Sequence, residues 1–408
     1  MKIGDCPDFP YNVPMNDLAL RIRIAARMAH IAPFEVMEIQ TLAREVEARG
    51  KDVVHLEIGE PDFRTPRPVV EAAKRALDTE PMFYTSALGL MPLREAIARF
   101  YAERYRVDVP ASRIVVTAGS SAALLLAFGV LLDPGDEVLL ADPGYPCNRH
   151  FVRTLGAVPR AVAVGPASRY QLTPELARRH WSEKTRMAMV ASPANPTGTL
   201  VTSEEVEGLA QLAREKGGTL LADEIYHGLT YGLDARTAAE AGEDVVVINS
   251  FSKYFQMTGW RLGWMVAPPD LVRRVEVLAQ NLFISPSTLA QHAALACFAP
   301  ETIDILEQRR AELDARRRFL IPALRSLGFG VPVVPEGAFY IYADSSRLAP
   351  DSFTFAREVL VEAGVAITPG KDFGANEPQK HVRIAYTQPV ARLEEAVERI
   401  ARFLARGR

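Results

Sequence analysis

The sequence predicts an α/β protein with a large domain built on a three-layer, mostly parallel sheet and a smaller α+β domain. Three observations support this prediction. From about residue 53, short apolar runs alternate with longer helical stretches, as in parallel sheets with crossover helices. Several runs are apolar throughout instead of at every second position, which suits strands buried on both faces. The chain also has 408 residues, which is more than one compact core usually holds.

The elements of the large domain can be placed by residue range. Between the apolar runs lie segments with helical character, such as 120–133 and 203–216. The runs expected to form strands are IVVT (114–117), EVLLA (137–141), RMAMVA (186–191), TLLAD (219–223), VVVIN (245–249) and LGWMVA (262–267).

The two ends of the chain predict the smaller domain. The segment 35–49 has apolar residues at helical spacing and is followed by Gly50, which suits the end of a helix. Towards the C-terminus we expect a helix at 302–326, strands at 331–335 and 338–343, a helix near 353–363, a strand at 381–386 and a closing amphipathic helix. The expected boundaries are 1–30 for an N-terminal arm with a short helix, 31–52 with 290–408 for the small domain, and 53–289 for the large domain.

The composition argues against several kinds of partner. Apolar residues make up 48% and charged residues 24%, as in ordinary globular proteins. The net charge of -3 gives no reason to expect nucleic acid or a membrane surface as a partner. No window approaches the ~20 apolar residues of a membrane helix. The N-terminus has acids and prolines where a signal peptide would have a basic start and an apolar run, which predicts a cytoplasmic protein.

The cysteines and histidines predict neither disulfides nor a metal site. Cys6, Cys147 and Cys297 are widely separated and odd in number, which fits a reducing compartment. The seven histidines form no H-x-x-x-H pattern.

The strongest chemical signal is the segment NSFSKYFQMTGWRLGW (249–264), which follows an expected buried strand. Ligands of open α/β sheets bind at such carboxyl ends of strands. Within it, Ser250 lies three residues before Lys253 and Arg261 eight residues after it. A hydroxyl group and a guanidinium near one lysine suit an aldehyde that carries a phosphate. Taken alone, a surface lysine on a loop would explain the segment equally well.

This segment resembles the cofactor-binding segment of the class I/II aminotransferases, fold type I enzymes that depend on pyridoxal 5′-phosphate (PLP). The similarity covers S-F-S-K and M-T-G-W-R-L-G-W. In that family the lysine holds PLP as a Schiff base, and the flanking serine and arginine bind the phosphate. The resemblance therefore implies these roles for Lys253, Ser250 and Arg261. It runs from about residue 30 to the C-terminus, with separated motifs in the family's order.

Two further motifs agree with a pyridine cofactor. TLLADEIY places Asp223 at the end of an apolar strand, where a charged carboxylate is costly unless it is paired. A protonated pyridine nitrogen would supply that partner; a helix N-cap or a salt bridge would also explain it. Asp223 and Tyr226 match the family's D-x-x-Y, and Asn195 in SPANPTGT matches its N-P-x-G. The resemblance implies that Tyr226 and Asn195 contact the phenolate oxygen, and it also assigns Asn195 to the substrate site.

The segment IVVTAGSSAALLLAF (114–128) predicts a strand, a glycine turn and a helix. Free backbone N–H groups at a helix start form an anion site, and Gly119 permits close approach of the backbone. The segment matches the family's phosphate loop, so Ser120 and Ser121 are expected on the phosphate. Which of the two serines donates stays open, and ordinary helix capping is the alternative.

Three residues from other segments complete the expected site. ADPGYPCN places Tyr145 after a strand, where the family has an aromatic ring stacked on the pyridine. HVRIAY carries Arg383 inside an apolar strand, and an internal arginine needs a carboxylate partner, which a salt bridge within the chain could also supply. In the family that partner is the α-carboxylate of the substrate. The family also has a glycine backbone close to the substrate, here Gly59.

The stretch MFYTSALGLMPLREAI resembles the family's segment whose tyrosine reaches the phosphate of the neighbouring subunit. That tyrosine is Tyr84 in this chain. The resemblance therefore implies a homodimer whose active sites are shared between subunits.

The resemblance implies an aminotransferase that moves an amino group between an L-amino acid and a 2-oxo acid by a ping-pong mechanism. We expect Lys253 to act as the base, Asp223 to keep the ring nitrogen protonated, and Arg383 to orient the substrate. Phe34 and Phe283 fall where relatives line the side-chain end of the substrate. These two rings favour neutral or aromatic amino acids.

Three alternatives differ in chemistry. A PLP-dependent carbon–sulfur β-lyase would have the same fold and is the main alternative. A PLP-binding transcription regulator would need a DNA-binding domain, and the segment before residue 30 is too short for one. A nicotinamide-dependent dehydrogenase would need G-x-G-x-x-G after an early strand, and the sequence has no such motif.

Overall fold

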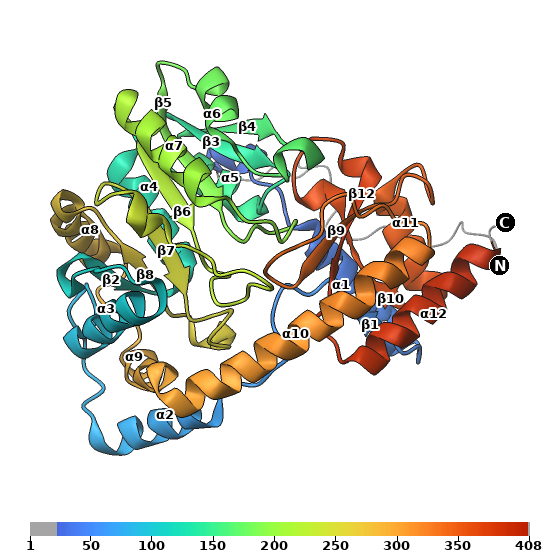
Figure 1. The fold of residues 1–408 in the computed structure, drawn as a ribbon, viewed down its shortest axis with the longest axis horizontal. Helices are drawn as coiled ribbons and strands as arrows, with labels where there is room; N and C mark the ends of the chain where they lie inside the picture. The colour runs from blue at the N-terminus through green and yellow to red at the C-terminus, as the bar shows by residue number, and fades with distance from the viewer. Residues whose placement is uncertain (1–22, 407–408) are drawn as a thin grey trace.

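A seven-stranded sheet forms the centre of the larger of two lobes (Figure 1). The computed structural model describes residues 23–406, so most of the expected arm and Cys6 lie outside the described residues. The strand order is β2-β8-β7-β6-β5-β3-β4, and β8 runs antiparallel to both of its neighbours. The strands are β2 (Ile114–Thr117), β3 (Glu137–Asp142), β4 (Val158–Ala163), β5 (Thr185–Ala191), β6 (Thr219–Asp223), β7 (Val246–Ser250) and β8 (Gly263–Val266).

Successive side chains of the sheet enter two different hydrophobic clusters, because strand side chains alternate between faces. Leu221 of β6 packs in a cluster with the helices α4 (Gly119–Leu131) and α8 (Pro269–Leu282). Its neighbour Leu220 packs in the cluster that includes α7 (Ser203–Glu215). Both faces of the sheet are therefore covered by helices, which confirms the predicted three-layer α/β domain.

Local signals place α7 where the sequence predicted it. Thr202 is the N-cap residue, and its side chain accepts a hydrogen bond from the backbone N–H of Glu205. The Glu205 carboxylate accepts in return from the N–H of Thr202 at 2.8 Å. This capping box satisfies donors that the first helical turn leaves open. The other helices of the larger lobe are α2 (Arg67–Thr79), α3 (Met91–Tyr105), α5 (Pro146–Thr154), α6 (Pro174–His180) and α9 (Thr288–Ala294).

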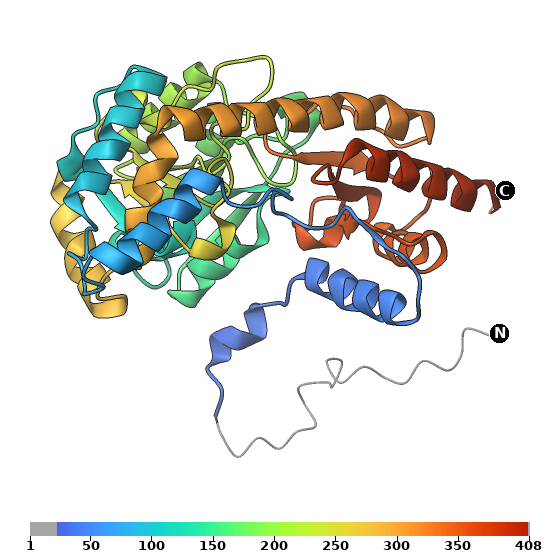
Figure 2. The ribbon, with the colours of Figure 1, turned by 90° about the horizontal axis from the view of Figure 1, so that it is seen from below.

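The smaller lobe contains two small sheets, and α1 lies along one side of it (Figure 2). One sheet is antiparallel, in the order β11-β12-β9, and the other pairs β1 with β10 in parallel. Its elements are α1 (Glu35–Ala48), β1 (Val54–His55), β9 (Tyr340–Asp344), α11 (Ser352–Glu358), a π-helical turn (Val359–Ala363), β10 (Val365–Ala366), β11 (Thr368–Pro369), β12 (His381–Ala385) and α12 (Val390–Arg406). Short 3₁₀ helices lie at Ala26–His30, Ala111–Arg113, Pro166–Ser168, Ala238–Ala241, Thr258–Trp260, Leu295–Phe298, Gly370–Asp372 and Pro378–Lys380.

The long helix α10 (Pro300–Ser326) runs from the larger lobe into the smaller one, as both views show (Figures 1 and 2). Its Arg316 is buried and forms two hydrogen bonds with the Asp62 carboxylate, at 2.8 and 3.0 Å. This bidentate pair ties the chain segment that crosses between the lobes to α10.

One predicted strand is wrong. Residues 331–335 form no strand, and the nearest pairing is an isolated bridge between Gly330 and Asp344. Pro332 and Pro335 lack the N–H groups that a strand interior needs. The expected domain boundaries stay a prediction, since α10 spans both lobes and β1 pairs with β10.

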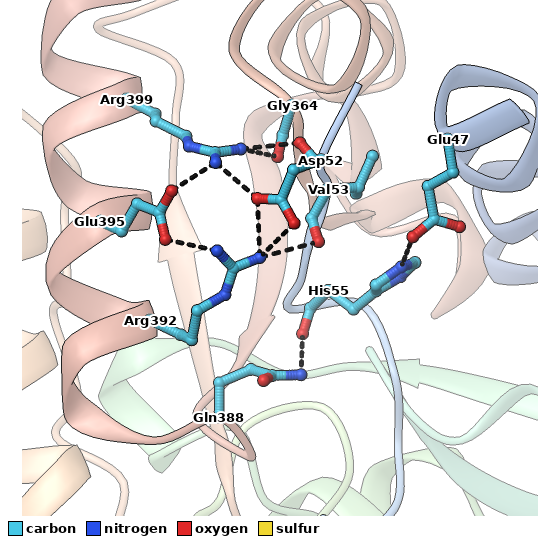
Figure 3. A network of polar contacts seen from close by, with 9 residues as sticks. All are labelled: Glu47, Asp52, Val53, His55, Gly364, Gln388, Arg392, Glu395 and Arg399. Atoms are coloured by element: carbon cyan, nitrogen blue, oxygen red, sulfur yellow. Dashed lines mark hydrogen bonds and ion pairs between the residues drawn. The ribbon is translucent and has the colours of Figure 1, made fainter. Parts of the chain in front are cut away.

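A cluster of charged side chains joins α12 to the residues that precede β1 (Figure 3). Arg392 and Arg399 both donate to the Asp52 carboxylate, at 2.9 and 2.6 Å. Glu395 pairs with both arginines. The entry of the chain into β1 is thereby held by charge-assisted hydrogen bonds.

In residues 23–406, no helix combines the length and apolar character needed to cross a membrane.

Candidate active site

A cavity of about 280 Å³ lies between the lobes, at the carboxyl ends of β5, β6 and β7. This volume is near the lower end of the range for small-molecule sites, about 300–1,000 Å³. The cavity brings together predicted residues that are far apart in the sequence. The predicted residues that line it are Gly59, Ser120, Ser121, Tyr145, Asn195, Asp223, Tyr226, Ser250, Lys253, Arg261 and Arg383.

Lys253 follows β7 and points its amine at the segment from the smaller lobe. Its Nζ donates a hydrogen bond to the Gly59 carbonyl at 2.7 Å. Burial lowers the pKa of Lys253 to about 8, while the charge of Glu60 acts in the opposite direction. An amine with this pKa is partly neutral near pH 8, and a neutral amine can attack a carbonyl carbon.

Asp223 ends β6 and is only 4% exposed. Its Oδ1 accepts from the backbone N–H of Ile225 at 3.2 Å. It forms no ion pair within 4 Å in the part of the chain that the structure describes. Burial raises the pKa of Asp223 to about 7, and the charge of Lys253 only partly offsets this. The carboxylate therefore favours any cationic group that enters the cavity.

The start of α4 forms a cradle beside Arg261. Ser120 and Ser121 lie in the first helical turn, where backbone N–H groups have no partner within the helix. Gly119 has φ +79°, and a Cβ there would lie 2.7 Å from Arg261 Nη2. Glycine is thus required for the guanidinium to lie against the turn. The cradle suits a phosphate group, and Ser250 faces the same cavity.

Arg383 lies in the middle of β12 and is 4% exposed. Its Nη1 donates to Asn195 Oδ1 at 3.0 Å, and its Nη2 donates to the Glu57 carbonyl at 2.6 Å and to Thr368 Oγ1 at 3.2 Å. Its Nε has no acceptor within residues 23–406, and no carboxylate in that range lies within 4 Å of the guanidinium. A buried guanidinium without a carboxylate can bind the carboxylate of a ligand.

Several lining residues were not predicted from the sequence, and three of them lie near Arg383 or Tyr226 or carry charge or an aromatic ring: Tyr340, Asp372 and Phe373. The Tyr340 hydroxyl lies 2.9 Å from that of Tyr226, and the Tyr340 ring lies 4.5 Å from the Arg383 guanidinium. Asp372 and Phe373 also line the cavity. The strand pattern of AFYIYA places Tyr340 and Tyr342 on one face but does not tell which face meets the cavity.

Of the aromatic residues expected at the site besides Tyr226, two line the cavity and two do not. Tyr145 is the N-cap residue of α5, and its ring centroid lies 6.4 Å from that of Phe34, which also lines the cavity. Phe283 does not line the cavity. It packs against the hydrophobic cluster that α4 and α8 form with one face of the large sheet. Tyr84 is 80% exposed and does not line the cavity within this chain.

Comparisons with known proteins agree with this geometry. Residues 51–400 match the family described as aminotransferase class I and II. The chain is 39% identical over 384 residues to a valine–pyruvate aminotransferase of Mycobacterium tuberculosis, with 94% of this chain and 98% of that protein covered. It is 36% identical to the (5-formylfuran-3-yl)methyl phosphate transaminase of Methanocaldococcus jannaschii, with 93% and 99% covered.

Solved structures show the same similarity. The crystal structure of an aminotransferase from Mycobacterium tuberculosis matches with a TM-score of 0.91 and 39% identity, over 94% of this chain and all of that one. None of these findings supports the β-lyase alternative. The chain therefore belongs to the class I and II aminotransferases, a family that uses PLP, and it is an aminotransferase.

Proposed function

We propose that this aminotransferase binds PLP at Lys253 and exchanges amino groups between L-amino acids with neutral side chains, including aromatic ones, and 2-oxo acids. The observation that carries the proposal is one cavity that holds a partly buried amine, a buried carboxylate without an ion pair and a buried guanidinium without a carboxylate. These groups are costly to bury unless a ligand pairs with them.

The residues present fit PLP group by group. The Lys253 amine suits the aldehyde, and the Asp223 carboxylate suits a protonated ring nitrogen. The turn at Gly119, with Arg261, suits the phosphate. The Tyr226 hydroxyl suits the phenolate oxygen. This match of donors and acceptors supports the cofactor assignment.

When bound, PLP supplies a conjugated ring that withdraws electrons from the substrate Cα. The chain's own residues would provide binding, orientation and proton transfer. Arg383 would hold the α-carboxylate, with Asn195 beside it, and so fix the direction of the Cα–H bond. Lys253 Nζ would take the Cα proton, because its lowered pKa suits a base near neutral pH. Asp223 would keep a proton on the ring nitrogen by its charge.

The lining of the cavity supports a neutral substrate side chain. Of the described lining residues, only Lys253, Arg261 and Arg383 are lysines or arginines, and the proposal already assigns each of them a role. The end formed by α1 contributes apolar atoms from Phe34. Asp372 also lines this space, and its carboxylate would repel a second carboxylate. The M. tuberculosis relative, named for valine and pyruvate, agrees with this choice.

We also propose a homodimer in which Tyr84 reaches the phosphate site of the partner subunit. Phe83 and Tyr84 are 78% and 80% exposed, an unusual state for two adjacent aromatic rings. Thr288 Oγ1 donates to the Phe83 carbonyl at 2.7 Å and so ties this segment to the start of α9. A second copy of the chain would cover both rings.

Reaction with PLP followed by borohydride should attach the cofactor to Lys253. Peptide mapping would locate the modified residue, and absorbance would report the yellow complex. The Lys253→Ala variant should form no coloured complex and should lose transamination, whereas Lys216→Ala, at an exposed lysine, should behave as the wild type. Modification of a different lysine would contradict the proposal.

Asp223→Asn should stabilise the cofactor-free protein at pH 8. Burial raises the folded-state pKa of Asp223 from 3.8 to about 7. The charged carboxylate therefore destabilises the folded protein increasingly as pH rises from about 4 to about 7. Removing the charge should increase the free energy of unfolding by up to about 4 kcal/mol at pH 8 and by little near pH 4. Denaturant unfolding at both pH values measures this.

The control for Asp223 is Asp142→Asn. Asp142 is also buried at a strand end, but its carboxylate accepts from the backbone N–H groups of Ala375 and Asn376. Its replacement should not stabilise the protein. Equal behaviour of the two variants would show that Asp223 carries no special burial penalty.

A panel of amino donors should show kcat/KM for valine or phenylalanine at least about tenfold above that for aspartate, because of repulsion by Asp372. Asp372→Asn should narrow this gap. The formation of the 2-oxo acid, measured with and without an acceptor, would also detect lyase activity as pyruvate and ammonia. A preference for aspartate would refute the assigned substrate class.

Tyr84→Phe should lower the affinity for PLP about tenfold, through loss of one hydrogen bond to a charged group. Mass measurement in solution should give a dimer for both proteins. Mixed dimers of Tyr84→Phe with Lys253→Ala should recover one site of wild-type affinity. A monomeric mass, or mixed dimers without a restored site, would count against shared sites.

A further inference from the structure

The segment from Glu57 to Gly59 presents backbone carbonyls to both key cations of the site. The Glu57 carbonyl accepts from Arg383 Nη2 at 2.6 Å, and the Gly59 carbonyl accepts from Lys253 Nζ at 2.7 Å. The Glu57 carbonyl also accepts from Thr368 Oγ1 at 3.3 Å. Because these are short contacts to a rigid backbone, the position of this segment sets the direction of the Arg383 guanidinium.

The side chain of Glu57 is an unusual anchor for this segment. It is fully buried, with 0% exposure, and its Oε2 has no partner among residues 23–406. Its Oε1 lies 2.9 Å from His55 Nδ1. No lysine or arginine of that range forms an ion pair with it. A buried carboxylate requires a cationic partner, and only His55 is within reach.

His55 connects this anchor to α1. Its Nε2 lies 3.1 Å from Glu47 Oε1, a contact drawn in Figure 3. The hydrogen bond to Glu57 raises the pKa of His55 to about 9, with a further contribution from Glu47, so the imidazole is charged at neutral pH. Gln388 and Ala366, on the neighbouring elements, contact the backbone of His55 and carry no charge.

The other end of α1 forms one wall of the cavity. Phe34, its N-cap residue, and Met37, in its first turn, line the site. The charged imidazole therefore lies between the helix that walls the cavity and the segment that directs the guanidinium. Glu47, His55 and Glu57 form a continuous chain of contacts, which we name the histidine clamp.

We infer that the histidine clamp positions Arg383 for the carboxylate of the substrate, so His55 is a positioning residue for transamination. This inference rests on the proposed role of Arg383. Backbone hydrogen bonds of Leu56 with Ala366 and Ala385 would remain without the clamp, but no side-chain contact would then link Glu57 to α1. The guanidinium would then have to be ordered at the moment of binding, at the expense of affinity.

The test measures the binding of 3-phenylpropionate to the PLP-loaded wild type and to three variants. This ligand has a carboxylate but no amine, so it cannot react. His55→Gln removes the charge of the clamp. The double variant His55→Leu with Glu57→Leu also removes the buried carboxylate, so that it folds without an uncompensated charge. Both variants should raise the Kd for 3-phenylpropionate about tenfold, which corresponds to the loss of one well-placed charged hydrogen bond. Calorimetry measures this Kd. Asp52→Asn, in the neighbouring cluster, should leave the Kd unchanged.

A second readout separates positioning from general damage. The rate of reaction with 2-phenylethylamine, which lacks the carboxylate, should be the same in wild type and clamp variants, whereas KM for phenylalanine should rise. PLP content, read from absorbance, should be equal in all forms. The inference would be wrong, and the proposed role of Arg383 unaffected, if the Kd were unchanged in the clamp variants. The same would follow if these variants lost activity equally with 2-phenylethylamine and with phenylalanine. A wild-type enzyme that does not bind 3-phenylpropionate would overturn the role of Arg383 and the inference with it.

Discussion

Burial of charge without an ion pair is the constraint on which the rest of this structure depends. Lys253, Asp223 and Arg383 are all withdrawn from bulk water in one cavity, and none of them is neutralised by a salt bridge. Such an arrangement costs free energy of folding. The fold limits the cost by offering backbone carbonyls and an amide oxygen, which satisfy hydrogen bonds but leave net charge for a ligand.

The architecture determines where this charge collects. The parallel strands β5, β6 and β7 end at the same edge of the sheet, so the residues that follow them meet there. The smaller lobe closes the cavity from the opposite side with β12 and the segment after β1. The site therefore needs both lobes. The long helix α10 and its Asp62–Arg316 pair connect them.

The smaller lobe contributes more than a cover. Asp52 and its arginine partners hold the start of β1, and the histidine clamp contacts its end at His55, four residues before Gly59. Helix α1 takes part in both the clamp and the cavity wall. The same short stretch of backbone accepts hydrogen bonds from Arg383 and Lys253, so the positions of these two side chains are linked through one segment.

The sequence alone determined the α/β class, most strand positions and about half of the residues that line the cavity, because each depends on local information. Apolar runs mark strands buried on both faces, and short motifs around Lys253, Asn195 and Arg261 match those of the family. The expected strand at 331–335 was wrong because its prolines outweigh its valines.

Only the tertiary structure decided the rest. Tyr340, Asp372 and the link from His55 through Glu57 to Arg383 depend on partners far apart in the chain, up to 326 residues. No local pattern states which face of a strand will meet a distant arginine, or which backbone carbonyl that arginine will contact. Those pairings arise when the two lobes pack, because burial makes each remaining polar group depend on the nearest partner in space.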